Sequence, residues 1–218
     1  MTTVFVLGQL CLGTAANRHK ALDLFRDIAQ YALEHEPGVF KYYITVPRDP
    51  ADDTSIYVFE EYANQAVVDA HFLTPPVQRL VNYLQSDPDI LAPLVYTLKP
   101  FLSFTRSTAL PSDPTIMYAS ITYAPGTKRQ AVAGWRDVVA ATHKHEPGAL
   151  SYNILEDTED PDKVNVFEVY ASESALWDVH ATNPVVVENK QKNGSIRTNV
   201  EHVRLKYVGG FLKRSILS

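Results

Sequence analysis

The feature that most constrains the fold of this sequence is an internal repeat. The tetrapeptide HEPG occurs at residues 35–38 and again at residues 145–148. The same shift of 110 residues places Phe25–Ile28 on Trp135–Val138. Shifts of 108 or 109 residues align further pairs: Phe59 with Phe167, Tyr62 with Tyr170, His71 with His180, and Pro75 with Pro184. Solenoid repeats have periods of about 20 to 50 residues, so this longer period indicates a duplicated domain.

The duplication predicts two domains in a chain of 218 residues. The segment RSTALPSDP, which begins at Arg106, combines Ser, Pro and Asp without apolar periodicity, as linkers do. We therefore expect an N-terminal repeat over residues 1–106, a linker over 107–114 and a C-terminal repeat over 115–218.

Each half has the sequence pattern of a βαββαβ unit. Alternating and β-branched segments predict strands near residues 3–9, 39–46, 55–62 and 94–99, and near 115–123, 149–156, 163–170 and 200–208. Apolar residues at helical spacing, from Leu22 to Leu33, predict a helix that Pro37-Gly38 ends. Asn64 is expected to cap a second helix, whose apolar stripe continues beyond Pro75-Pro76.

This order is that of a ferredoxin-like sheet with both helices on one face. The other face also needs cover, because the strand over residues 55–62 is apolar on both sides, with Ile56 and Val58 alternating with Tyr57 and Phe59. We expect an α+β fold in which two such sheets face each other, as an intramolecular version of a dimer. A further homodimer is left open.

Composition indicates which kinds of partner and which cellular compartment to expect. Apolar residues make up 45% of the chain, charged residues 21%, and the formal net charge is −5. The sequence has no cluster of Lys and Arg of the kind that binds nucleic acids or anionic membranes. Its apolar runs are too short to span a bilayer. Cys11 is the single cysteine, and the sequence has no zinc spacing, so we expect a cytoplasmic, metal-free protein.

Two runs carry a family resemblance: HEPGVFKYYITVPRDPADDTSIYVFEEYANQAVVDAHFLTPPV and HEPGALSYNILEDTEDPDKVNVFEVYASESALWDVHATNPVV. They resemble the antibiotic biosynthesis monooxygenase family of dimeric α/β barrels. The shared pattern is EPG, a strand tyrosine, an aromatic-Glu pair and a helical His before a Pro-containing break. The resemblance implies the fold, and an activity among those of a family that includes cofactor-free oxygenases, haem-degrading oxygenases, isomerases and cyclases.

His71 and His180 are the candidate catalytic residues. Each follows an apolar residue by four positions, so each should point from its helix towards the sheet. An imidazole in a pocket there would serve as a general base near neutral pH. The alternative is a structural histidine bonded to a backbone carbonyl or a strand tyrosine.

Several strand residues are candidates for contact with a ligand. Tyr42 and Tyr152 lie in phase with buried positions, and could either bond a phenolic substrate or complete the core. Glu60 and Glu168 are expected to form ion pairs at the rim of the barrel, with a buried base as the alternative. His35 and His145 end helices and are expected to be structural.

The two tryptophans distinguish the halves. Trp135 and Trp177 replace Phe25 and Val68, and would give the second half a wider aromatic wall for a flat substrate. Core filling is the alternative for both indoles. On this basis we expect His180 to be the working base, with Trp135, Trp177 and Phe25 as substrate contacts.

The leading functional hypothesis is a cofactor-independent monooxygenase of secondary metabolism. It would oxidise an electron-rich aromatic polyketide, anthrone or polyphenol with O2, with no bound cofactor, since the sequence has no nucleotide-binding glycine loop. The pattern also lacks the later histidine that the haem-degrading relatives use. The alternatives are a cyclase or isomerase that uses the same His base without O2, and a non-catalytic binding protein.

Overall fold

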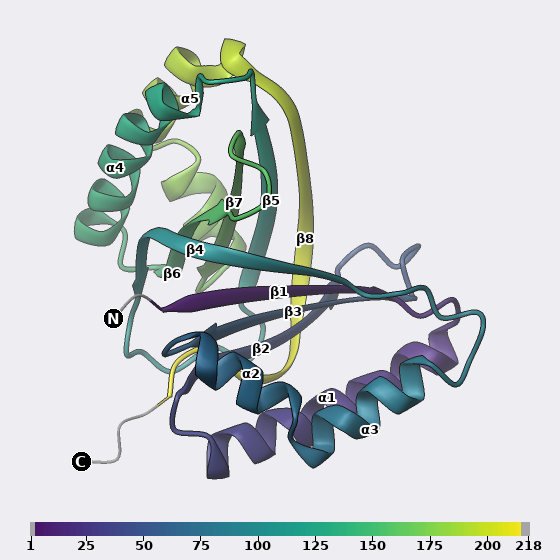
Figure 1. Ribbon diagram of the computed structural model, residues 1–218. Coiled ribbons are helices and arrows are strands. Elements are labelled where there is room, and N and C mark those ends of the chain that lie inside the picture. Colours follow the sequence, from purple (N-terminus) through teal and green to yellow (C-terminus); the bar gives the residue numbers. More distant parts are fainter. Residues whose placement is uncertain (1–2, 215–218) are drawn as a thin grey trace. The chain divides into compact units, whose positions relative to one another are not determined.

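The computed structural model describes residues 3–214, which form two compact units (Figure 1). The first unit contains the described residues up to Thr97 and those from Tyr207 onward, and the second contains Leu98–Lys206. Each unit is an antiparallel sheet with helices on one face. Within residues 3–214, no helix combines the length and apolar character that a membrane span requires.

The first unit holds three complete strands and three helices among its described residues. They are β1 (Val4–Cys11), α1 (Ala15–His35), β2 (Val39–Pro47), β3 (Ser55–Tyr62), α2 (Gln65–Phe72) and α3 (Pro75–Leu84). Strand β3 lies between β1 and β2 and is antiparallel to both. Leu22, Phe25 and Ile28 of α1 are buried against the sheet, as their helical spacing predicts.

Helix ends in this unit follow the expected sequence signals. The side chains of Thr14 and Asn64 accept hydrogen bonds of 3.1 Å from the N–H groups of Asn17 and Val67, which caps α1 and α2. Pro75 occupies the first turn of α3, where a backbone N–H would have no partner within the helix, so its absence costs no hydrogen bond. The predicted cap at Asn64 and the break at Pro75-Pro76 are confirmed.

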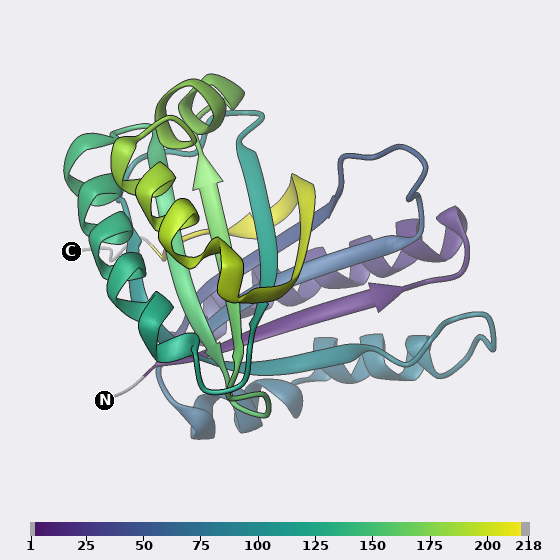
Figure 2. The same ribbon diagram turned by 90° about the horizontal axis from the view of Figure 1, so that it is seen from above.

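The second unit repeats the arrangement. It contains β5 (Thr115–Tyr123), α4 (Lys128–His145), β6 (Ala149–Asp157), β7 (Lys163–Tyr170), η1 (Ala175–His180), α5 (Pro184–Asn193) and the short η2 (Gly194–Ile196). Strand β7 lies between β5 and β6, and α4 and α5 lie side by side over one face of the sheet (Figure 2). The counterpart of α2 is the π-helical turn η1, in which the N–H of Ala181 bonds to the carbonyl of Leu176.

The last strand of each repeat is longer than the sequence predicts. Strand β4 (Leu94–Thr105) continues beyond residue 99, and its residues 98–105 pair with β6 in the second unit. Strand β8 (Arg197–Phe211) pairs with β5 and then enters the first unit, where Tyr207 stacks on Tyr43. For β4 the prediction stopped early because Pro100, at a register shift, interrupts the strand pattern.

Strand β8 contains a glycine, next to its last residue, for a steric reason. Gly210 has a φ of 89°, and a Cβ there would lie 1.9 Å from the carbonyl oxygen of Tyr42. Only glycine allows the chain to pass so close to β2.

The order of elements confirms the predicted fold class, α+β with two ferredoxin-like βαββαβ repeats of the dimeric α/β-barrel type. The compact units are not the same segments as the sequence repeats over 1–106 and 115–218. Each repeat instead gives part of its last strand to the unit that contains the other repeat's helices.

Candidate active site

The imidazole of His71 lies at the centre of the candidate site in the first unit. Helix α2 directs this ring towards the sheet, and the side chain is 2% exposed. Its Nδ1 atom lies 2.9 Å and 3.1 Å from the two carboxylate oxygens of Glu36. An ionised carboxylate only accepts hydrogen bonds, so Nδ1–H donates, and Nε2 of the neutral ring carries the lone pair.

The HEPG turn is the source of the Glu36 carboxylate. Glu36 ends α1, with its N–H bonded to the carbonyl of Ala32 at 3.0 Å. Gly38 lets the second helix approach, because a Cβ there would lie 2.8 Å from Cγ2 of Val67. The motif is therefore a helix stop, as predicted, and also supplies the partner of the histidine. Sequence reasoning missed this role, although each HEPG glutamate recurs with a helical histidine, as Glu36 with His71 and Glu146 with His180.

Two tyrosines and a second carboxyl group surround the imidazole. The rings of Tyr42 and Tyr62 lie with centroids 5.7 Å and 5.4 Å from that of His71. The hydroxyl of Tyr62 donates to the carboxylate of Glu60, which is buried. All these groups come from β2 and β3, next to α2.

The electrostatics of the cluster favour a protonated imidazole. Burial lowers the pKa of His71, but the hydrogen bond with Glu36 and the negative charges of Glu60 and Glu36 outweigh it, so the pKa lies above its usual value. Burial also raises the pKa of Glu60, which the charge of His71 and the Tyr62 hydrogen bond partly offset. His71 is thus a stronger base than a free imidazole.

The expected rim ion pairs of Glu60 and Glu168 are wrong. Both side chains are buried and bond to tyrosine hydroxyls. The neighbouring Glu61 forms the ion pair instead, 3.6 Å from Nζ of Lys41. Successive residues on a strand point to opposite faces, so Glu60 belongs to the helix-covered face and Glu61 to the other. Burial lowers the pKa of Lys41 to about 8, an effect that Glu61 opposes.

An apolar cavity opens beside His71 in the first unit. Its volume is about 110 Å³, and it opens to solvent at a wider mouth. Its polar side chains are His71, Glu60 and Tyr42. The apolar lining comes from the sheet, from α1 and from α3: Val6, Leu10, Val58, Phe25, Ile28, Val77, Leu80, Val81, Leu84 and Val95. Such a lining suits an apolar molecule that presents one polar group to the imidazole.

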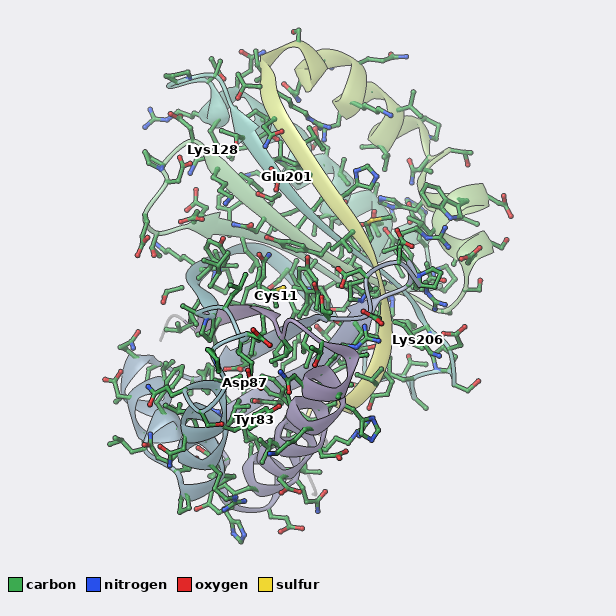
Figure 3. The ribbon with its side chains drawn as sticks, turned by 90° about the vertical axis from the view of Figure 1, so that its right-hand side faces the viewer. Cys11, Tyr83, Asp87, Lys128, Glu201 and Lys206 are labelled. Atoms are coloured by element: carbon green, nitrogen blue, oxygen red, sulfur yellow. The ribbon has the colours of Figure 1, made fainter. Side chains whose placement is uncertain are left out.

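Side chains at one end of α1 and α3 tie these two helices together. The hydroxyl of Tyr83 donates to Oδ1 of Asn17 at 3.0 Å, and Nδ2 of Asn17 donates to the carboxylate of Asp87 at 3.1 Å. Tyr83 and Asp87 lie close together beside the helices of this unit (Figure 3). These bonds fix the separation of the two helices that form the cavity wall.

The second unit contains the same polar cluster. Nδ1 of His180 lies 2.8 Å from the carboxylate of Glu146, and the rings of Tyr152 and Tyr170 lie 5.2 Å and 5.4 Å from the imidazole. The hydroxyl of Tyr170 donates to Glu168 at 2.9 Å. The repeat therefore preserves five interacting side chains, one His, two Glu and two Tyr, at matching places.

The surroundings of His180 differ from those of His71. Trp135 and Met117, which are larger than their counterparts Phe25 and Val6, are buried beside the cluster. The indole N–H of Trp135 donates to the Tyr123 hydroxyl at 2.9 Å. Trp135 is thus packed in the core of this unit.

Trp177 does not form part of a buried aromatic wall. Its side chain is 45% exposed, because η1 turns it outward while Leu176 and His180 point inward. The expectation that Trp177 contacts a substrate beside His180 therefore loses its basis, and so does the preference for His180 over His71. Phe25 and Tyr42, by contrast, line the cavity of the first unit.

Glu146 also has more partners than Glu36. One of its oxygens bonds to His180, and the other accepts a hydrogen bond of 2.6 Å from Nδ2 of Asn183. Burial raises the pKa of Glu146, but the hydrogen bonds from His180, Asn183 and Thr142 outweigh it, so the pKa lies below its usual value. In the described part of the chain, no group of three His, Cys, Asp or Glu side chains is placed to hold a metal ion.

Comparison with known proteins identifies the family. The family model described as antibiotic biosynthesis monooxygenase matches residues 13–83 and 114–189. The chain belongs to this family. The model matches twice in one chain, which confirms the tandem duplication. No protein with a curated function matches the sequence.

Solved structures similar over the whole chain confirm the fold. A proposed monooxygenase from Fusobacterium nucleatum has a TM-score of 0.84 at 14% identity, with 99% of both chains covered. One from Lactobacillus acidophilus has a TM-score of 0.80 at 16% identity, covering 97% of this chain and 99% of its own. An anthrone oxidase-like protein has a TM-score of 0.64 at 10% identity, covering 95% and 92%.

Proposed function

We propose that this protein is a cofactor-independent monooxygenase that oxidises an electron-rich aromatic small molecule in the cavity of the first unit. The observation that carries the proposal is that His71, held by Glu36, is one of three polar side chains in an otherwise apolar cavity. Family membership supports a monooxygenase-type reaction, and the anthrone oxidase-like protein of similar fold supports an aromatic substrate.

His71 acts as the general base. Glu36 accepts from Nδ1–H and so holds the tautomer whose Nε2 takes a proton from a phenol, or from a carbon next to a carbonyl. The carboxyl groups of Glu36 and Glu60 stabilise the imidazolium that forms. Phe25 and Tyr42 contact the flat substrate, and the apolar walls exclude water from the anion.

The deprotonated substrate supplies the electrons for O2. For an anthrone-type methylene, loss of a proton gives a carbanion that forms a carbon–oxygen bond with O2. Loss of the second hydrogen and cleavage of the oxygen–oxygen bond then give a carbonyl and one molecule of water. One oxygen atom enters the product and the other leaves as water, so the four electrons come from the substrate. The protein contributes a base, a binding site and exclusion of water.

The second repeat retains its cluster as a structural element. His180 joins Glu146, which also holds Asn183, the residue that caps α5 through a 3.0 Å bond from the N–H of Val185. Trp135 fills the space beside it. The catalytic prediction therefore moves from His180 to His71.

Turnover and O2 uptake on a panel of anthrones and polyphenols test the proposal. His71→Ala should lower turnover about a hundredfold to ten-thousandfold, the range of general base catalysis. The matched control His180→Ala should keep turnover within about threefold, provided that circular dichroism shows both variants folded. With ¹⁸O2, one labelled oxygen atom should appear in the product.

Three results would contradict this function. Wild-type turnover in His71→Ala would show that His71 is not the general base. Conversion of substrate without O2 uptake would indicate a cyclase or isomerase. If the protein binds the test compounds tightly and every compound is recovered unchanged, the protein is a binding protein.

A further inference from the structure

Arg214 bonds to the backbone on both sides of the turn that carries Glu36. Its guanidinium donates four hydrogen bonds, to the carbonyls of Ala32 at 2.6 Å, Leu33 at 2.7 Å, Glu36 at 2.8 Å and Val39 at 3.1 Å. Its own N–H donates to the carbonyl of Phe40 at 3.1 Å. All these groups belong to the first unit.

Three of these carbonyls belong to the C-terminal end of α1, where intrahelical donors run out; those of Ala32 and Glu36 also accept from the N–H groups of Glu36 and Val39. Ala32 and Leu33 lie in the last turn of α1, and Glu36 is its C-terminal cap. A cation there also interacts favourably with the helix dipole. Because the planar guanidinium bonds to both ends of the turn, it fixes the backbone from which the Glu36 side chain reaches His71.

Arg106 makes the same contacts in the second unit. Its guanidinium donates to the carbonyls of Ala149 at 2.8 Å, His143 at 2.6 Å and Glu146 at 3.3 Å, and its N–H donates to Leu150 at 2.8 Å. Each acceptor lies 110 residues after its counterpart in the first unit. Two arginines that share four matching acceptors, all but that of Ala32, indicate a device that the duplication preserved.

The two arginines are exchanged between the repeats. Arg106 follows β4 at the end of the first sequence repeat, yet it bonds to the turn that carries Glu146 of the second. Arg214 follows β8 at the end of the second repeat, yet it bonds to the turn that carries Glu36 of the first. Each histidine–glutamate pair thus depends on an arginine that the other repeat supplies.

We propose that Arg214 is a positioning residue that holds Glu36, and through it His71, in the geometry required of the base. Its effect on turnover rests on the proposed function, but its effect on the imidazole does not. The titratable groups that face His71 are Glu36, Glu60, Tyr42 and Tyr62, and Arg214 acts on the backbone of the first of these.

The test compares Arg214→Lys with Arg106→Lys. Lysine keeps the charge but cannot bond to four carbonyls in one plane, so the comparison isolates geometry from charge. In Arg214→Lys, nuclear magnetic resonance of the His71 ring should show its pKa falling towards the usual value of about 6.5, while that of His180 stays in place. Arg106→Lys should give the reverse pattern.

Turnover supplies an independent readout. Arg214→Lys should lower kcat about tenfold with little change in KM, since a misplaced base acts after binding and a displacement of about 1 Å can cost about a hundredfold. Arg106→Lys should leave kcat unchanged. Arg214→Gln, which also removes the charge, should again lower the pKa of His71, and provides a second variant if the lysine variant does not fold.

The outcomes separate this inference from the proposed function. An unchanged His71 pKa in both Arg214 variants would overturn the positioning role, whatever happens to turnover. A lowered His71 pKa in a protein that oxidises no substrate would support the positioning role and contradict the monooxygenase proposal.

Discussion

The two repeats share a polar cluster and differ in the space beside it. In the first unit, His71 and Glu36 adjoin an apolar cavity bounded by Phe25 and Leu80. In the second, the positions of Phe25 and Leu80 are taken by Trp135 and Asn189, both buried. The comparison shows that both repeats of this chain keep a His–Glu pair, whereas the residues that face the pair differ in size and polarity.

Glu36 and Glu146 differ in the number of side chains that they bond to. Both oxygens of Glu36 face Nδ1 of His71, so this carboxylate serves the imidazole. Glu146 divides its oxygens between His180 and Asn183, and so joins α4, η1 and the start of α5. We therefore expect chemistry to depend on Glu36 and stability to depend on Glu146.

The largest effect is expected from the matched pair Glu36→Gln and Glu146→Gln. Glu36→Gln removes the charge that stabilises the imidazolium and should lower kcat about a hundredfold, within the range of general base catalysis. Glu146→Gln should leave kcat within about threefold. It should lower the free energy of unfolding by about 1 to 3 kcal/mol, because buried donors lose an ionised acceptor. Steady-state kinetics and urea unfolding measure the two effects, and an equal loss of kcat in both variants would contradict the comparison.

A second prediction exchanges the residues that differ. Phe25→Trp should fill the cavity of the first unit and lower kcat/KM about tenfold, which corresponds to about 1.4 kcal/mol. Trp135→Phe removes the donor to Tyr123 and should lower the free energy of unfolding by about 1 to 3 kcal/mol without changing kcat/KM. Faster turnover in Phe25→Trp would show that the substrate binds elsewhere.

The two histidines should also separate in their response to pH. Neutral His71 is the active form, so kcat/KM should rise with pH around a midpoint above about 6.5. The free energy of unfolding should change in the opposite direction. The pKa values of both His71 and His180 are raised in the folded state, so their stabilisation is complete below about pH 6.5 and is lost as pH rises through the folded values.

His180→Gln provides the control for this pH prediction. It should reduce the loss of stability between pH 6 and pH 9 and leave the midpoint of the activity profile unchanged. A shifted activity midpoint in this variant would assign the titration to the second repeat.

The smallest effect is expected at Trp177. Its exposed side chain predicts that Trp177→Ala changes the free energy of unfolding by less than about 0.5 kcal/mol and leaves KM unchanged. Substrate protection of Trp177 fluorescence from an aqueous quencher would contradict its placement away from the ligand.

Much of the fold followed from the sequence, because duplication gives each element two independent readings. The helix caps, the order of elements and the inward direction of His71 and His180 rest on local patterns, and the structure agrees with them. The exchange of β4 and β8 between units was not predictable, since each pairs with residues far away in sequence and Pro100 interrupts the local strand signal.

The candidate site was predicted less completely. Polar residues on strand and helix faces indicated His71 and Tyr42, but Glu60 was expected at the rim. The partner of His71 lies in a motif whose helix-ending role already explained it. Whether Trp135 bounds a pocket or fills one depends on packing with Tyr123, which no periodicity reveals. The arginines were missed because they donate their hydrogen bonds to backbone carbonyls, and the sequence does not show which carbonyls will lie near an arginine.

The filled core around Trp135 has a consequence for how such a protein changes over time. When two identical chains form a pair, one altered codon changes both copies of a cavity, so neither can be lost while the other is kept. A single gene that encodes both copies removes this constraint. One half is then free to trade its binding space for packing, while its strand and its arginine continue to serve the half that retains the space.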